Sequence, residues 1–170
     1  MSENNQASPI PLLTVIGKSG SGKTTLIEKL IRELTRRGYR LATIKHHSHA
    51  GFEVDTQGKD SWRFAQAGSQ QVVIAAPDKF ATYRRLDHEL SLDEVAAEIH
   101  EVDLILVEGY KRSNKPSLEV LRAAHSLELI GSIEQRIALV TDAALDAGVQ
   151  RFALDDISGI AGFIEQRFLR

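Results

Sequence analysis

The sequence has 170 residues, of which 42% are hydrophobic, and this is enough apolar surface for one domain with a sizeable core. Its formal net charge of −2 predicts no general affinity for nucleic acid, and the lack of cysteine excludes disulfides and thiolate metal sites. The polar N-terminus lacks a signal-peptide core and no apolar run is long enough to span a membrane, so we expect a cytoplasmic protein without a membrane partner.

The first structured stretch, after a flexible lead-in of residues 1–10, is predicted to be a strand, a glycine-rich loop and a helix. The apolar, β-branched run Leu12–Ile16 predicts a buried strand. Residues 25–37 carry apolar side chains at helical spacing, which predicts an amphipathic helix capped by Gly38. Between them lies the Walker A pattern in the context that it requires, Gly17-Lys18-Ser19-Gly20-Ser21-Gly22-Lys23-Thr24.

This loop has the chemistry of a triphosphate site. Its three glycines let successive backbone N–H groups point inward as donors, and the following helix adds positive charge at its N-terminus. Lys23 supplies a full charge toward the β- and γ-phosphates, and the Thr24 hydroxyl is a ligand for Mg²⁺. We therefore predict nucleotide contacts from Gly17, Lys18, Ser19, Gly20, Ser21, Gly22, Lys23, Thr24 and Thr25.

The middle of the chain is predicted to hold short elements around one long loop. A strand over residues 39–45 is followed by residues 46–58, which show no periodicity and are long enough to suggest a functional loop. A short helix over residues 59–67, a buried strand over 71–76, an edge hairpin strand over 80–86 and a capped helix over 91–100 follow.

Three histidines in the long loop leave several interpretations open. His46, His47 and His49 fit a metal site, a phosphate or pterin contact, or plain polar surface. Adjacent loop histidines rarely converge on one ion, so polar surface is the simplest of the three.

The second half of the chain contains a candidate second phosphate element. The strand predicted over residues 103–107 delivers Glu108 at its end, as in a Walker B motif, where the acid holds Mg²⁺ directly or through water. Further strands are predicted over residues 118–122, 137–141 and 152–154. A closing helix then turns its apolar side chains inward, namely Ile160, Phe163, Ile164 and Phe168.

Alternation of strands with helices predicts a three-layer α/β fold, a P-loop NTPase fold with a mainly parallel sheet, as a single nucleotide-binding domain over residues 1–170. Ligands of such sheets bind beyond the carboxyl ends of the strands. We therefore expect the P-loop, the histidine loop and Glu108 to gather at that edge.

The order of these motifs resembles the MobB family, the molybdopterin-guanine dinucleotide biosynthesis adaptor proteins. The resemblance rests on the P-loop, on Ile44-Lys45-His46, on Asp55 followed by Gly58-Lys59-Asp60-Ser61, and on the run from Leu104 to Lys111. It implies a homodimer that binds GTP and Mg²⁺, hydrolyses GTP slowly at most, and assists the guanylyltransferase that attaches GMP to molybdopterin. Molybdopterin or its guanine dinucleotide is then an implied partner.

The same resemblance implies roles for individual residues. Lys23 and Asp55 are expected at the γ-phosphate as catalytic residues, His46 as a nucleotide contact, and Glu108 at the Mg²⁺ beside Thr24. An N-cap or turn residue is the equal alternative for Asp55. Lys18 matches the signature lysine of the deviant Walker A ATPases, which reaches the partner subunit's nucleotide. A solvated loop lysine is the alternative for Lys18.

Base selectivity has weaker support in the sequence. Asp142 ends a predicted strand, where a carboxylate accepts hydrogen bonds from guanine N1 and N2. The full GTPase signature also has a lysine two residues earlier, and Val140 stands there. The preference for GTP therefore rests on the resemblance.

A P-loop small-molecule kinase is the alternative function. Such enzymes close an arginine-rich lid over the donor, and Arg84 and Arg85 are the candidates for it. A second phosphate-bearing ligand has a candidate basic wall in Lys111, Arg112 and Lys115.

Overall fold

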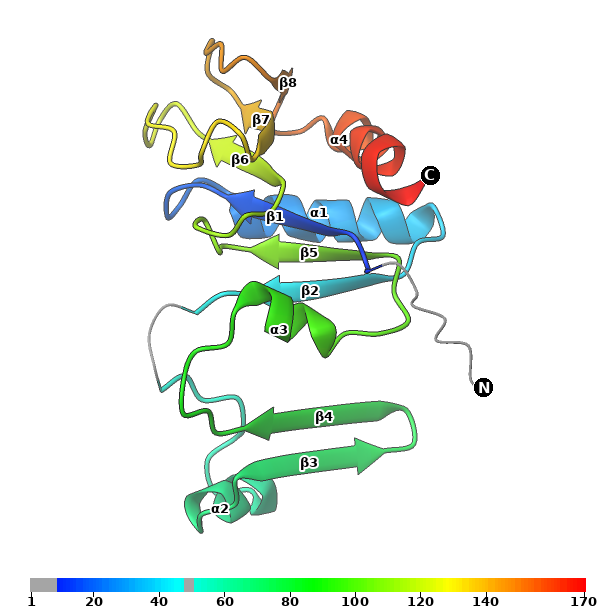
Figure 1. Cartoon of the computed structure of the whole chain (residues 1–170), viewed down its shortest axis with the longest axis vertical. Coiled ribbons are helices and arrows are strands. Elements are labelled where there is room, and N and C mark those ends of the chain that lie inside the picture. Colours follow the sequence, from blue (N-terminus) through cyan, green and yellow to red (C-terminus); the bar gives the residue numbers. More distant parts are fainter. Residues whose placement is uncertain (1–8, 48–50) are drawn as a thin grey trace, which may run out of the picture. The chain divides into compact units, whose positions relative to one another are not determined.

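The computed structural model describes residues 9–47 and 51–170 (Figure 1). Most of the predicted lead-in and His49 lie outside these residues. The chain divides into two compact units, Met1–His46 with Leu92–Arg170, and His47–Ser91. The single domain stays a prediction, because compactness alone does not show that either unit folds by itself.

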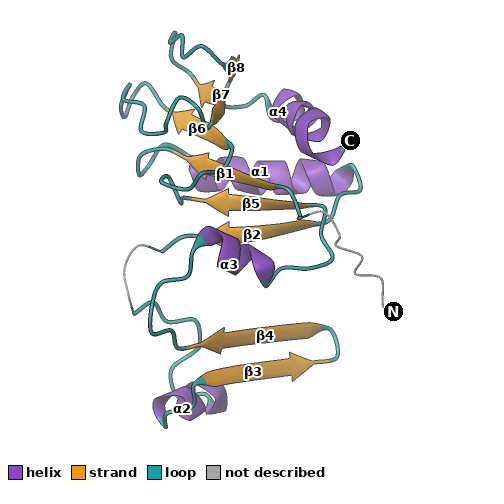
Figure 2. Ribbon diagram, viewed as in Figure 1, coloured by secondary structure: helices purple, strands orange, loops and turns teal. Residues whose placement is uncertain are grey.

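The first unit is built on a six-stranded sheet in which every pair of neighbours is parallel (Figure 2). The strand order is β2-β5-β1-β6-β7-β8, which places the P-loop strand in the interior of the sheet. The strands are β1 (Leu12–Ile16), β2 (Leu41–Lys45), β5 (Leu104–Glu108), β6 (Ser117–Leu121), β7 (Arg136–Thr141) and β8 (Gln150–Phe152).

Helices cover both faces of this sheet. On one face lie α1 (Lys23–Arg36) and α4 (Ile157–Ile164), which continues as a π-helical turn, η1 (Glu165–Leu169). The other face carries α3 (Leu92–Ala97). This confirms the predicted three-layer α/β fold. No helix in the described parts of the chain is long and apolar enough to cross a membrane.

The apolar run of β5 is explained by these two layers. Leu104 and Leu106 pack in the cluster that contains α1, whereas Ile105 and Val107 pack in the cluster that contains Leu92 of α3. All four of these β5 side chains are at most 1% exposed. A strand buried on both faces needs apolar residues at every position, which is why the sequence shows no alternation here.

The described residues of the second unit form the helix α2 (Asp60–Gln66) and an antiparallel hairpin of β3 (Gln71–Ala76) and β4 (Lys79–Arg84). The predicted hairpin is confirmed, but the prediction that residues 71–76 form a buried strand is wrong. Only Val72 of β3 is buried, and Val73 and Ile74 are 51% and 44% exposed. The hairpin is a separate two-stranded sheet, and within the described part of its unit only the short helix α2 is there to cover it.

The connection from β6 to β7 departs from the predicted alternation of strand and helix. Residues 122–135 form turns and irregular chain, and within them Ile130 and Gly131 lie against Glu119 of β6. Glu119 is 1% exposed beneath them, where its carboxylate accepts from Ile130 N at 2.5 Å and from Arg136 Nε at 2.6 Å. Arg136 also donates to the Gly131 carbonyl at 2.8 Å, so one buried ion pair fixes the connection.

We predict that Arg136→Leu lowers the free energy of unfolding by about 3–5 kcal/mol, because it leaves the buried Glu119 carboxylate without its cation. The double variant Glu119→Leu/Arg136→Leu should lose less, since no buried charge remains. Urea unfolding followed by circular dichroism measures both. Arg151→Leu, which changes an exposed arginine of β8, is the control. A double variant less stable than Arg136→Leu would contradict this account.

Candidate functional site

The P-loop follows β1, and its glycines adopt backbone conformations that other residues rarely adopt. The φ angles of Gly17, Gly20 and Gly22 are 147°, 77° and 98°. A Cβ on Gly17 would lie 2.3 Å from the carbonyl oxygen of Val120 on the neighbouring β6, so only glycine fits there. Gly22 is the N-cap of α1, and its left-handed conformation lets α1 begin at Lys23, two residues before the predicted start.

Lys23 bridges the loop. Its Nζ donates to the Lys18 carbonyl at 2.9 Å. Partial burial lowers the pKa of Lys23 below its ordinary value, the nearby Glu108 carboxylate opposes this shift, and Lys45 adds to it. The cation is therefore held at the centre of the loop, close to the acid at the end of β5.

Thr24 and Glu108 come together as the sequence predicts. β1 and β5 are adjacent parallel strands with Val15 opposite Glu108, so the loop after β1 and the acid ending β5 share one edge. Thr24 Oγ1 donates to Glu108 Oε2 at 2.8 Å, and Lys45 Nζ lies 3.4 Å from Glu108 Oε1.

These two oxygens fit adjacent positions around an octahedral Mg²⁺. Metal–oxygen distances of about 2.1 Å place neighbouring ligands roughly 2.9 Å apart, close to the separation between Thr24 and Glu108. Among residues 9–47 and 51–170, no group of three or more His, Cys, Asp or Glu side chains is arranged to hold a metal ion. One carboxylate and one hydroxyl match the sparse protein ligation of Mg²⁺ at phosphate sites.

His46 lies at the same edge. Its backbone N–H donates to the Glu108 carbonyl at 2.9 Å, and its ring lies 4.3 Å from that of Tyr110. Tyr110 has a φ of 51°, an uncommon value for a residue other than glycine, directly after Glu108 and Gly109. His47 instead lies in the second unit, where its ring is 5.4 Å from that of Phe52.

Asp55 lies in the second unit and has local partners. Tyr83 Oη donates to Asp55 Oδ2 at 3.0 Å, and Thr56 N donates to Asp55 Oδ1 at 2.7 Å. A hydrogen bond with the Ser61 side chain is the largest cause of a lowered pKa of Asp55, with the Thr56 and Tyr83 bonds adding to it. Its catalytic role stays a prediction.

Lys18 and Asp142 also have partners within the first unit. Lys18 forms an exposed ion pair with Glu128, which lowers the pKa of the Glu128 carboxyl. Asp142 follows β7, and its Oδ1 accepts from Ala123 N at 2.7 Å. The trans contact of Lys18 and the guanine contact of Asp142 both stay predictions.

Of the basic residues predicted for a lid or a phosphate-binding wall, some have partners within the protein and others are exposed. Arg85 donates to the Ala65 carbonyl of α2 at 2.7 Å, and Lys115 pairs with Asp93 of α3. Lys111 and Arg112 are exposed in the turn after Glu108.

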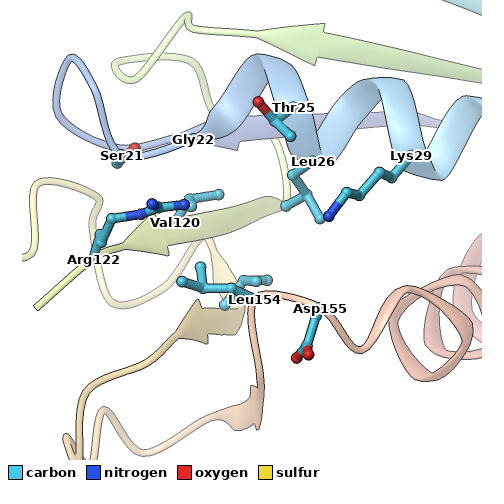
Figure 3. A pocket seen from close by; sticks show the side chains of 10 residues that line it. Ser21, Gly22, Thr25, Leu26, Lys29, Val120, Arg122, Leu154 and Asp155 are labelled. Carbon is cyan, nitrogen blue, oxygen red and sulfur yellow. The ribbon is translucent and has the colours of Figure 1, made fainter.

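Sequence reasoning missed Arg122. This residue follows β6, and its Nη2 lies 3.2 Å from the point where a Cβ of Gly22 would be. Arg122 also lines a cavity beside the start of α1 (Figure 3). The available signal was the position of Arg122, a charged residue at the carboxyl end of a predicted strand. The same kind of position singled out Glu108.

Comparisons with known proteins find relatives over nearly the whole chain. Residues 12–142 match the family model MobB, molybdopterin guanine dinucleotide synthesis protein B. The chain is 42% identical over 164 residues to the molybdopterin-guanine dinucleotide biosynthesis adapter protein of Haemophilus influenzae, covering 95% of this chain and 90% of that protein. Identity to the Escherichia coli adapter protein is 36%, with 91% of each chain covered. A crystal structure of molybdopterin-guanine biosynthesis protein B (mobB) has a TM-score of 0.71 and 31% identity, covering 91% of this chain and 98% of that one.

The electrostatics of the loop give a prediction for Lys23. Glu108→Gln removes the charge that raises the pKa of Lys23, so this pKa should fall further below the ordinary lysine value. An NMR titration of the Lys23 side chain measures the shift. Glu134→Gln, at an exposed glutamate, should leave the titration as in wild type. A higher pKa of Lys23 in Glu108→Gln would contradict the arrangement.

Proposed function

Because this chain belongs to the MobB family, we propose that it is a GTP-binding adapter in molybdopterin-guanine dinucleotide synthesis. The contact of Thr24 with Glu108, at the edge where β1 and β5 end, is the observation that carries the nucleotide part of this proposal. It joins the two elements on which Mg–nucleotide binding depends, the P-loop and the acid of the Walker B strand.

Each part of the site has a role in this proposal. Backbone N–H groups between Gly17 and Thr24, with the N-terminus of α1, bind the phosphates. Lys23 leaves the Lys18 carbonyl and donates to the β- and γ-phosphate oxygens. Thr24 and Glu108 hold Mg²⁺, which neutralises phosphate charge when bound.

We propose that hydrolysis is slow and that nucleotide binding is the functional event. Asp55, the residue expected to orient the attacking water, has both carboxylate oxygens engaged within the second unit. Lys23 and Glu108 bind and position phosphate and metal, which stabilises bound nucleotide without selecting the transition state.

We further propose that the adapter acts as a homodimer on the guanylyltransferase that attaches GMP to molybdopterin. Large apolar side chains of the second unit are exposed, and an interface between two copies would cover such surface. They include Phe52, Val54, Phe64, Val73, Ile74 and Phe80, with exposures between 44% and 72%. Burying them between two copies removes this surface from water.

The GTP proposal predicts that Lys23→Ala abolishes binding of a fluorescent GTP analogue in the presence of Mg²⁺, because a charge-assisted contact to the phosphates is lost. Lys79→Ala, at an exposed lysine of β4, should bind like wild type. Unlabelled GTP should displace the analogue at lower concentration than ATP. Equal displacement by ATP would refute the guanine preference, and wild-type affinity of Lys23→Ala would refute the phosphate site.

The adapter proposal predicts that the chain increases formation of molybdopterin-guanine dinucleotide from GTP and molybdopterin only when the guanylyltransferase is present. Product analysis with and without that enzyme tests this, and Lys23→Ala should remove the increase. A phosphorylated acceptor formed by this chain alone would instead support the kinase alternative.

A further inference from the structure

The connection after β6 runs along the P-loop. We call residues 122–128 the flanking segment. Its side chains contact the P-loop at three positions, and the two segments run in opposite directions. The pairs are Arg122 with Gly22, His125 with Gly20, and Glu128 with Lys18. Arg122 Nη2 and His125 Cε1 each lie 3.2 Å from the point where a Cβ of the paired glycine would be, so a side chain at either glycine would have to displace its neighbour.

The flanking segment is fixed at both ends. At its start, Ala123 N donates to Asp142 at 2.7 Å. Beyond its end, Gly131 packs closely over β1, where a Cβ would lie 2.5 Å from Ile16 Cδ1. The backbone of Gly131 also donates to Glu119 and accepts from Arg136, the two members of the buried ion pair. The position of Arg122 beside the P-loop therefore follows from the fold and not from a flexible side chain alone.

Arg122 has unused hydrogen-bonding capacity at this position. Its Nε is buried and finds no hydrogen-bond partner among the described residues. The hydroxyl of Ser21, a residue 3% exposed in the P-loop, is likewise buried without a partner among them. Buried donors are normally satisfied, and a guanidinium forms its strongest hydrogen bonds with anionic groups such as phosphate.

The cavity beside Arg122 has the charge of an anion site. It is lined by Ser21, Gly22, Thr25, Lys29, Arg122 and Asp155, together with apolar side chains. Figure 3 shows Arg122 below the loop that carries Ser21 and Gly22, and Lys29 extending from α1 on the same side, while the carboxylate of Asp155 is turned away from α1. Two cations and the N-terminus of α1 favour a phosphate group here.

Building on the proposed GTP-binding function, we propose that Arg122 is a phosphate-binding residue of the same site, supplied in cis by the flanking segment. Its guanidinium contacts the phosphate chain from the β6 side, opposite the side from which Glu108 acts. The P-loop is then bounded by a carboxylate for the metal on one strand and a cation for the phosphates on the other.

Titration calorimetry with GTP and with tripolyphosphate tests this, each with Mg²⁺. Arg122→Ala should weaken binding of both ligands by about tenfold or more, because one charge-assisted contact to phosphate is lost. Arg122→Lys should recover part of the affinity, since lysine keeps the charge but not the planar fork. Arg32→Ala makes the same change of charge at an exposed position of α1 and should bind like wild type.

The outcomes separate this proposal from the proposed function. If Lys23→Ala loses GTP and Arg122→Ala binds both ligands like wild type, the role of Arg122 is refuted and the P-loop function stands. If Arg122→Ala weakens GTP but not tripolyphosphate, Arg122 contacts the nucleoside and the phosphate assignment is wrong. If Lys23→Ala binds GTP normally, the proposed function is refuted, and with it the role of Arg122 that rests on it. If thermal unfolding shows that Arg122→Ala is not folded, Arg122→Gln replaces it with the same expected results.

Discussion

The interior position of β1, paired in parallel with β5 on one side and β6 on the other, is the constraint on which the site depends. Its register sets Val15 opposite Glu108 and Ile16 opposite Glu119, so the P-loop leaves β1 at the end of β5 and alongside the last residues of β6. A slip of one residue would turn the side chains of β1 to the opposite faces of the sheet. The aliphatic residues of β1 and β5 thus place the polar groups that follow them.

Two ion pairs near the P-loop differ in how much they contribute to the stability of the fold. The exposed pair of Lys18 and Glu128 contributes little to stability, because water screens both charges. The pair of Glu119 and Arg136 is almost fully buried, and breaking it leaves a charge in the interior. We infer that this buried pair, with the bonds from Ile130 and Gly131, fixes where the β6–β7 connection lies.

Features set by local sequence were predictable, and features set by distant contacts were not. The P-loop, β5 and the pairing of Thr24 with Glu108 follow from short motifs and the rule that parallel strands end at one edge. The exposure of β3 was missed because a short apolar run looks the same in the sequence whether the strand is covered on both faces or left exposed. Arg122 was missed because its meaning comes from Gly22, which lies 100 residues earlier in the sequence.

The arrangement of charge also bears on how an adapter of this kind would use GTP. In the proposed function, Lys23, the N-terminus of α1 and Arg122 would stabilise phosphates that are already negative in the ground state. Interactions of equal strength in ground and transition states tighten binding without accelerating hydrolysis. In the proposed function, a site dominated by such contacts would therefore retain GTP and would suit an adapter that acts through a partner enzyme more than an enzyme that turns GTP over.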